Sequence, residues 1–346
     1  MRKSLIISIL IFAILAMAFT GCGSADRKEA GLDTDEERAL QAKLQEKLAD
    51  EDKLYIDADP QTTEVVITLY YKHEIADFLV PEQRKVQKDK QSLEQLVVEE
   101  LLKGPQGFGK LMVMPTDVEV IDVTRKADTV FVNLSEEFKN DVDLSAIPGK
   151  QNIAEEDKKS VLADMKRLAI YSIVNSITDI EGGLKVKFLV DNKQLTYEEI
   201  GTGLLVEDAG KIEPDTPMAA LNRDKDFILC PSRSVEYVLK AMTGKPNYDV
   251  VYKFLASKTA DGSDLPSIEE FKRLMTAVDI TLETDDNPID EEEIKSDGNT
   301  AYVTTHFTIK YSDGKKEVME GEVFTVVRED GIWKVILPNI FNRVKG

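Results

Sequence analysis

Between residues 62 and 202, apolar positions follow strand-like and helix-like periods in turn. β-branched and aromatic residues dominate Val65–Tyr71, which predicts a strand. Val118–Thr124, Thr129–Leu134 and Leu184–Val190 have the same character, and the short turn between the first two of them predicts a hairpin. Four strands are therefore expected in this part of the chain.

Two helices are expected between these strands. Ser92 and Gln95 form a capping box before a Leu-rich face, and Gly104-Pro105 ends that helix. Apolar residues keep helical spacing over residues 160–177, which predicts a long and deeply buried helix. The resulting order, β-α-β-β-α-β, favours an α+β fold with an antiparallel or mixed sheet and both helices on one face.

A second small α+β domain is expected over residues 231–346, after a charged and turn-rich connector at residues 203–230. Its first part favours helices and its second part favours long strands joined by tight turns. The helices are expected from Ser232 or Ser234 to Gly244, at Tyr248–Leu255 and at Ser267–Met275; the strands are expected at Asp279–Thr284, Thr300–Tyr311, Lys316–Arg328 and Gly331–Leu337, with Asp313-Gly314 and Asp330-Gly331 as hairpin turns.

Residues 1–21 have the features of a secretion signal. Arg2 and Lys3 precede the apolar run Leu5–Phe19, which is shorter than the roughly 20 residues that a membrane-spanning helix needs. Small residues then surround Cys22, and this order resembles the bacterial lipobox, whose cysteine becomes the lipid-carrying N-terminus. The alternative is an uncleaved anchor in which Cys22 has no role. We expect lipidation at Cys22 and attachment to the extracytoplasmic face of the cell membrane.

Residues 22–61 are expected to hold the folded part away from that membrane. Residues 23–33 are small, charged and contain glycine, which favours a flexible tether. Leu40, Leu44 and Leu48 then give a helix one thin apolar stripe. We interpret this segment as a stalk helix, because a coiled coil with a partner would need more heptads than it has.

Charge narrows the range of partners. The formal net charge is −20, and loss of Arg2 and Lys3 with the signal would make it −22. A chain this acidic is not suited to releasing counterions from phosphates, so nucleic acid is not an expected partner. It also lacks the clustered Lys and Arg that bind anionic lipid, so acyl chains on Cys22 are the expected link to the membrane.

The chain has two cysteines and two histidines. Cys230 has no intramolecular partner once Cys22 carries lipid, and its apolar surroundings favour a buried small side chain over a reactive thiol. His73 ends a predicted strand and is expected at the surface. His306 is expected on a polar strand face with Tyr302, Thr304 and Thr308; the alternative is a ligand-binding or catalytic His–Asp pair inside a cone. No catalytic residue is assigned, and His306 is the candidate for ligand binding.

No metal site or cofactor is expected. The acidic run at residues 285–293 lacks the glycine and the oxygen spacing of an EF-hand, which favours a solvated loop between strands. One free cysteine and two scattered histidines do not suit zinc, and the sequence has no Gly-rich phosphate loop. Tyr70, Tyr71 and Trp333 favour core positions over stacking platforms for cell-wall glycans.

Residues 62–202 resemble the GerMN module of spore germination and sporulation lipoproteins. The resemblance rests on the order of all the elements rather than on one motif. Asn192 stands where the family has glycine, and Asn tolerates the same left-handed turn. The matching segments are Val65–Tyr71, Leu93–Pro105, Met114–Val118, Val130–Ser135, Ile173–Ile180 and Val186–Lys193.

Residues 231–346 resemble the NTF2-like cone fold, with Asp330–Val335 as the closing strand. The GerMN resemblance implies a role in sporulation or spore germination by protein–protein assembly at the cell envelope. With the lipid expected on Cys22, we expect a non-enzymatic, membrane-anchored lipoprotein. The implied partners are envelope or sporulation proteins, which would bind domain surfaces and sheet edges. The alternatives are a ligand-binding or weakly hydrolytic cell-wall module that uses the cone around His306, and a general envelope protein of a non-sporulating bacterium.

Overall fold

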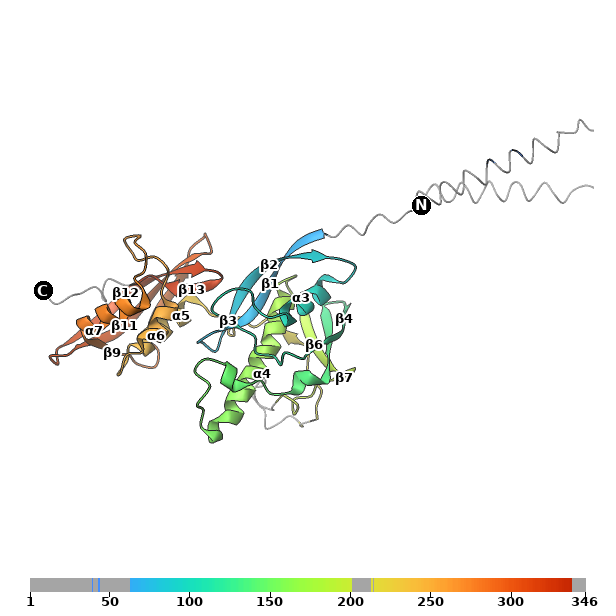
Figure 1. The fold of residues 1–346 in the computed structure, drawn as a ribbon, viewed down its shortest axis with the longest axis horizontal. Helices are drawn as coiled ribbons and strands as arrows, with labels where there is room; N and C mark the ends of the chain where they lie inside the picture. Colours follow the sequence, from blue (N-terminus) through green and yellow to red (C-terminus); the bar gives the residue numbers. More distant parts are fainter. Residues whose placement is uncertain (1–38, 40–42, 44–62, 201–212, 214, 338–346) are drawn as a thin grey trace, which may run out of the picture. The chain divides into compact units, whose positions relative to one another are not determined.

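The computed structural model describes residues 63–200, 213 and 215–337, together with Ala39 and Lys43 (Figure 1). The expected signal, the lipidation site Cys22, and all of the tether and stalk except Ala39 and Lys43 lie outside the described residues, so these assignments stay predictions. Every element described below belongs to one compact unit, Thr62–Gly346. The domain boundaries expected at residues 202 and 231 also stay predictions.

The first sheet is antiparallel and has the strand order β2-β1-β3. β1 spans Thr63–His73, β2 spans Leu79–Lys88 and β3 spans Lys110–Leu111. β2 is not among the predicted strands, because its charged residues and Pro81 hide the strand alternation. Its even-numbered positions 80, 82 and 84 are nevertheless buried. Pro81 is tolerated because β2 lies at an edge of the sheet.

The second sheet is mixed and has the order β4-β5-β6-β7, with β8 also paired to β6. β5 and β6 are parallel, and the helix α4 (Glu155–Thr178) makes the crossover between them. The expectation of one sheet is therefore wrong: β2 supplies the partner of β1, and the hairpin β4–β5 belongs to a separate sheet. The strands of this sheet are β4 Val120–Lys126, β5 Thr129–Leu134, β6 Lys185–Val190, β7 Lys193–Gln194 and β8 Leu221–Asn222.

Helix α4 lies against both sheets. It begins earlier than predicted, and the acidic residues of its first turn suit the positive end of the helix dipole. Every residue from 168 to 178 is buried, in agreement with the apolar spacing. The Ser176 hydroxyl accepts a hydrogen bond of 2.9 Å from the Tyr70 N–H of β1, and the same helix contacts β6 (Figure 1). α4 therefore joins the two sheets around one core.

The other predicted helix of this part is α3 (Leu93–Leu102). The Ser92 hydroxyl accepts a hydrogen bond from the Gln95 N–H at 3.1 Å, which confirms Ser92 as the N-cap. Two short 3₁₀ helices follow the second strand of the hairpin, η1 at Glu136–Lys139 and η2 at Leu144–Ala146.

The C-terminal part has three helices followed by a curled antiparallel half-barrel, which confirms the expected order of helices and strands (Figure 1). The sheet order is β10-β11-β12-β13, with β9 paired to β11. β10 corrects the expectation of a loop for the acidic run, because Ile289–Ile294 pairs with β11 while its glutamates stay exposed. The elements are α5 Pro231–Ala241, α6 Tyr248–Phe254, α7 Ile268–Val278, β9 Ile280–Glu283, β10 Ile289–Ile294, β11 Thr300–Tyr311, β12 Lys316–Glu329 and β13 Ile332–Val335.

The β1–β2 hairpin contributes to two hydrophobic cores. Leu69 and Leu79 belong to the first core, together with side chains of α3, α4 and the second sheet. Ala76 and Val80, at the turn of the same hairpin, belong to the core of the C-terminal part. Because residues of one hairpin belong to both cores, the chain of the hairpin connects the two cores directly, in addition to the packing between them.

The turn between β12 and β13 packs directly on β2. Gly331 has a φ of +83°, and a Cβ atom added to it would lie 2.2 Å from the carbonyl oxygen of Pro81. The Lys110 Nζ donates a hydrogen bond of 3.0 Å to the carbonyl oxygen of Asp330. The predicted hairpin turn at Asp330-Gly331 is confirmed, and its glycine also permits a close approach between chain segments.

Candidate functional site

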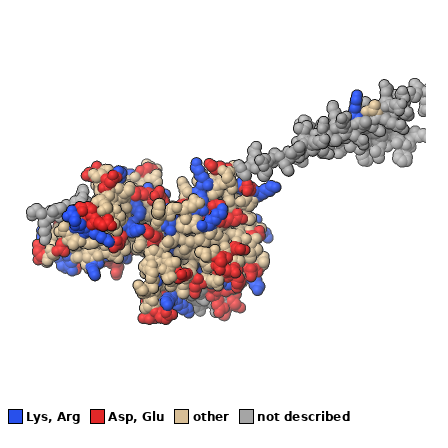
Figure 2. Space-filling view, viewed as in Figure 1, with Lys and Arg blue, Asp and Glu red and all other residues tan. Residues whose placement is uncertain are grey.

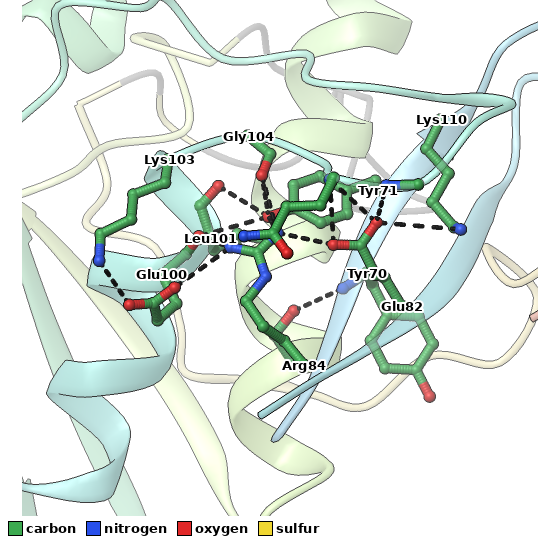
Figure 3. A network of polar contacts seen from close by, with 12 residues as sticks. Tyr70, Tyr71, Glu82, Arg84, Glu100, Leu101, Lys103, Gly104 and Lys110 are labelled. Atoms are coloured by element: carbon green, nitrogen blue, oxygen red, sulfur yellow. Dashed lines mark hydrogen bonds and ion pairs between the residues drawn. The ribbon is translucent and has the colours of Figure 1, made fainter. Parts of the chain in front are cut away.

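A buried guanidinium, Arg84 on β2, binds the C-terminal end of α3 (Figure 3). Its Nη1 donates to the carbonyl oxygen of Glu100 at 2.8 Å, and its Nη2 donates to the carbonyl oxygen of Gly104 at 2.9 Å. The Tyr71 hydroxyl also donates to the Gly104 carbonyl, at 3.0 Å. These donors satisfy carbonyl groups that the end of a helix leaves free, and a cation there suits the helix dipole.

The same guanidinium binds two buried carboxylates. Arg84 Nη2 lies 2.6 Å from Glu82 Oε1, and its Nη1 lies 3.2 Å from Glu100 Oε2. Burial alone would raise the pKa of Glu82. Hydrogen bonds from Arg84 and from the Gly107 and Gln106 amides nevertheless hold that pKa below its usual value. The carboxylate is therefore charged at neutral pH and fixes the loop that follows α3.

That loop carries Phe108 at its tip. The Gly107 N–H donates to Glu82 Oε2 at 2.9 Å, and the Glu74 N–H donates to the Gly109 carbonyl oxygen at 2.9 Å. Although the loop is bonded on both sides of its tip, the Phe108 side chain is 96% exposed. A fixed backbone thus presents a large aromatic side chain to solvent.

Beside this network lies a cleft of about 1080 Å³. One wall comes from β1 and β2, including Tyr70 and Glu82, and the opposite wall comes from β12 and β13, including Arg328 and Trp333. The segment that leads into α5, with Cys230, also lines the cleft. The walls belong to segments that are far apart in the sequence, which is why their proximity cannot be read from local patterns.

Guanidinium groups cover both aromatic rings of the cleft. Arg223 lies over the Tyr70 ring at 5.1 Å from its centroid, and Arg328 lies over the Trp333 ring at 4.4 Å. Arg223 Nη1 is also 3.0 Å from Asp179 Oδ1. Burial is the largest influence on Tyr70, and it raises the pKa of the hydroxyl, so this group stays neutral.

Most charged side chains of the cleft already have partners within the protein. Within the described residues, Arg328 and Lys225 make no ion pair and no side-chain hydrogen bond, although both line the cleft. Uncommitted positive charge therefore faces this cleft in a chain of net charge −20. The acids already engaged are Glu82 with Arg84, Asp179 with Arg223, and Glu292 with the Ser232 amide.

His306 lies on the polar strand face that the sequence predicts, since Thr305 and Phe307 on either side are buried. Its Nδ1 is 2.6 Å from Asp290 Oδ1, and its Nε2 is 3.0 Å from Asp285 Oδ2. The hydrogen bonds with Asp285 and Asp290 raise the pKa of His306. Both ring nitrogens are engaged by carboxylates, so the imidazole has no free nitrogen for a nucleophile or a ligand in this arrangement.

His73 is fully buried, so the expected surface position is wrong. β1 is the central strand of its sheet, and the Phe254 ring of the C-terminal part lies 4.8 Å from the imidazole. Nδ1 accepts hydrogen bonds from the N–H groups of Ile75, at 3.2 Å, and Ala76, at 3.0 Å. Burial, together with a smaller effect of nearby lysines, lowers the pKa of His73 to about 3. The ring is therefore neutral and structural.

Cys230 is half-buried rather than buried, because it is the N-cap of α5 at the edge of the cleft. It is a free thiol, and its Sγ lies 3.1 Å from Ser232 Oγ. Tyr70, Tyr71 and Trp333 are at most 5% exposed, which confirms their expected core positions.

The described residues hold no group of three or more His, Cys, Asp or Glu side chains placed to bind a metal ion. On the face shown in Figure 2, Lys and Arg side chains are interspersed with Asp and Glu and form no continuous basic surface. Among the helices that the structure describes, none has both the length and the apolar character needed to cross a membrane.

Sequence reasoning missed the network around Arg84 and the cleft. One signal was available: Val80, Glu82, Arg84 and Val86 alternate along β2, and the first three of them are buried. Charges at inward positions of a strand suggest a paired network, but their partners on α3 could not be located from the sequence.

Comparison with known proteins identifies the N-terminal part of this unit. Residues 68–196 match the family described as "Germane: Sporulation and spore germination". Residues 68–196 are a GerMN (Germane) domain. This domain holds Arg84, Glu82 and the Phe108 loop, whereas Arg328 and Trp333 on the far wall of the cleft lie outside it. None of the curated proteins compared with the chain matches it significantly.

Three solved structures show similarity to this GerMN-containing chain, each at 20% identity over 47% of the chain. The tandem GerMN domains of the sporulation protein GerM from Bacillus subtilis match over 48% of their own length, with a TM-score of 0.29. The first GerMN domain of GerM matches over 99%, with a TM-score of 0.28. A structure described as "Putative Lipoprotein from Clostridium perfringens" matches over 92%, with a TM-score of 0.24. The chain thus matches about half of the tandem-domain structure.

Proposed function

We propose that this chain is a non-enzymatic lipoprotein, anchored to the extracytoplasmic face of the cell membrane, that acts in sporulation or spore germination by assembling with other envelope proteins. The observation that carries the proposal is the GerMN domain at residues 68–196, whose family is described by these two processes. Anchoring rests on the lipobox-like sequence at Cys22.

Binding rather than catalysis is supported by the state of the two histidines. Carboxylates engage both nitrogens of His306, and burial holds His73 neutral inside the fold. Neither imidazole has a serine, threonine or cysteine side chain as a hydrogen-bond partner among the described residues. Covalent catalysis first requires a nucleophile in contact with a base. Neither His73 nor His306 forms such a pair.

Assembly with proteins is supported by Phe108. An aromatic side chain that is 96% exposed on a fixed loop can enter a partner's pocket with little loss of backbone entropy. Edge strands offer a second mode of contact, because β2, β4 and β10 each lie at the end of a sheet.

For the C-terminal part we propose an NTF2-like cone, supported by three helices packed on a curled antiparallel sheet. Phe254, Phe324 and Trp333 pack into the core between those helices and the sheet. His306 lies on the other face of the sheet, where it lines a pocket of about 570 Å³, and Asp285 and Asp290 in that pocket engage both of its ring nitrogens. This argues for an assembly surface rather than a glycan-binding or hydrolytic cone.

Gene replacement in a sporulating host tests the proposal. Deletion is expected to lower the yield of heat-resistant spores or to slow their germination, and the wild-type gene should restore both. Cys22→Ser should behave like the deletion and lose labelling by radioactive palmitate. The matched variant Cys230→Ser should keep the label. Unchanged spores after deletion would overturn the role in spore formation or germination, and palmitate retained by Cys22→Ser would overturn the anchor.

A further inference from the structure

We propose that the cleft lined by Arg328 and Lys225 binds an extended acidic peptide segment of a partner protein. The inference rests on the proposed function in one respect, that the chain acts by binding proteins. It adds the place of binding and the chemistry of the bound segment.

The size of the cleft suits a peptide. Its volume of about 1080 Å³ is slightly above the roughly 300–1,000 Å³ of pockets for drug-sized ligands, and it is far larger than a single phosphate needs. Its lining alternates charged residues with apolar ones such as Pro81, Ile228 and Pro231. A peptide that carries both carboxylates and small apolar side chains matches this mixture.

The sign of the ligand follows from the charges that remain free. The acids Glu82, Asp179 and Glu292 are already engaged within the protein. The carboxylate of Asp330, the fourth acid of the lining, makes no ion pair or hydrogen bond among the described residues and acts on Lys110 only at longer range, so two free cations face one free carboxylate. Arg328 and Lys225 remain without a carboxylate among the described residues, so carboxylates of a ligand would complete them.

Arg328 is held in place before any ligand arrives. Its guanidinium lies over the Trp333 ring, and its backbone N–H donates to the carbonyl oxygen of Asn299 at 2.9 Å. A preorganised cation loses less side-chain entropy on binding than a free one. Lys225 is exposed and adds a second positive charge to the lining of the cleft.

Glycans and nucleic acids fit the cleft less well. Sugars and bases stack on open aromatic faces, whereas guanidinium groups already cover Tyr70 and Trp333.

The chain contains its own reporter for the test. Trp333 is the sole tryptophan of the sequence and lies under Arg328, so a ligand that binds the guanidinium should change the fluorescence of Trp333. We would titrate the full chain in detergent with a peptide of alternating Glu and Val. A saturable change is expected, and it should weaken as NaCl is raised. The same peptide with Gln for Glu should bind at least tenfold more weakly.

Variants locate the binding. Arg328→Gln should weaken binding of the acidic peptide at least tenfold, and Lys225→Gln should weaken it several-fold. Lys225 is exposed and its side chain makes no ion pair or hydrogen bond among the described residues, so its replacement should leave the fold intact. Arg273→Gln is the matched control, because it removes the same charge from an exposed position on α7 outside the cleft, and it should leave binding unchanged.

Four results would overturn the proposal: no saturable change, equal binding of the Gln peptide, wild-type affinity in both cleft variants, or equal binding by inorganic phosphate alone. If the chain binds the acidic peptide but its deletion leaves spores unchanged, the proposed role in sporulation or germination is wrong and the peptide-binding cleft stands. If deletion causes a spore defect but the chain does not bind the peptide, the proposed role stands and the peptide-binding cleft is wrong.

Discussion

At the scale of single residues, His306 joins segments that precede its own strand. Its two nitrogens contact Asp290 at the start of β10 and Asp285 in the loop before it. Both bonds place an N–H donor against a carboxylate only when the ring is protonated, which is why they raise the pKa of His306 and lower that of Asp285. The side chain is 35% exposed, so solvent screens much of this interaction.

This geometry predicts a pH-dependent contribution to stability. The pKa of His306 is raised on folding, so its stabilisation is fully present below the ordinary value of about 6.5 and is lost as the pH rises through the folded pKa. His73 acts in the opposite direction, because its lowered pKa makes unfolding take up a proton as the pH falls below about 6.5. A comparison of wild type with His306→Gln cancels the effect of His73. The difference in free energy of unfolding, measured with urea, should be larger at pH 6 than at pH 8. Equal differences at the two pH values would contradict the prediction.

At the scale of elements, sequence periodicity predicts correctly those strands and helix ends that depend only on neighbouring residues. Thr129–Leu134 has the bounds of β5, and Ser92 caps α3 as expected, because both depend on neighbouring residues alone. Strands β2 and β10 were missed because charged residues occupy positions where alternation would require apolar ones. In β2 those charges are buried against α3, and long-range pairing of this kind leaves no local signal.

We therefore expect the buried Arg84 to contribute more to the stability of the fold than the exposed charged residues beside it on β2. Arg84→Met removes the guanidinium donors to Glu82, Glu100 and the end of α3, so two buried carboxylates would lose the cation between them. We expect a loss of about 3–5 kcal/mol in the free energy of unfolding, measured with urea. Lys85→Met is the matched control on the same strand, because the Lys85 side chain is 73% exposed. It should cost less than about 0.5 kcal/mol. Similar losses in the two variants would show that the network contributes little.

At the scale of the whole unit, two cores depend on one hairpin. The sequence predicts most elements of both parts, but it predicts neither β2 nor a special role for the segment between β1 and β2. In the structure Ala76 of that segment and Val80 of β2 pack with the C-terminal core, while Leu69 and Leu79 pack with the first. The cleft owes its existence to the same arrangement, because the β12–β13 turn reaches Pro81 on β2.

Shared structure predicts shared unfolding. We expect urea to unfold Thr62–Gly346 in a single transition. Trp333 fluorescence, which probes the C-terminal core, should change at the same urea concentration as far-UV circular dichroism.

Gly331→Ala should weaken the contact between the parts, since its Cβ would lie 2.2 Å from the Pro81 carbonyl oxygen. The control is Gly314→Ala, whose φ of +84° imposes the same backbone strain while nothing lies within 4 Å of the added Cβ. Gly331→Ala should cost about 1–3 kcal/mol more than this control and should separate the two probes. Transitions that differ in the wild type, or equal costs in the two variants, would show that the cores fold independently and that the cleft between them is not fixed by the contact at Pro81.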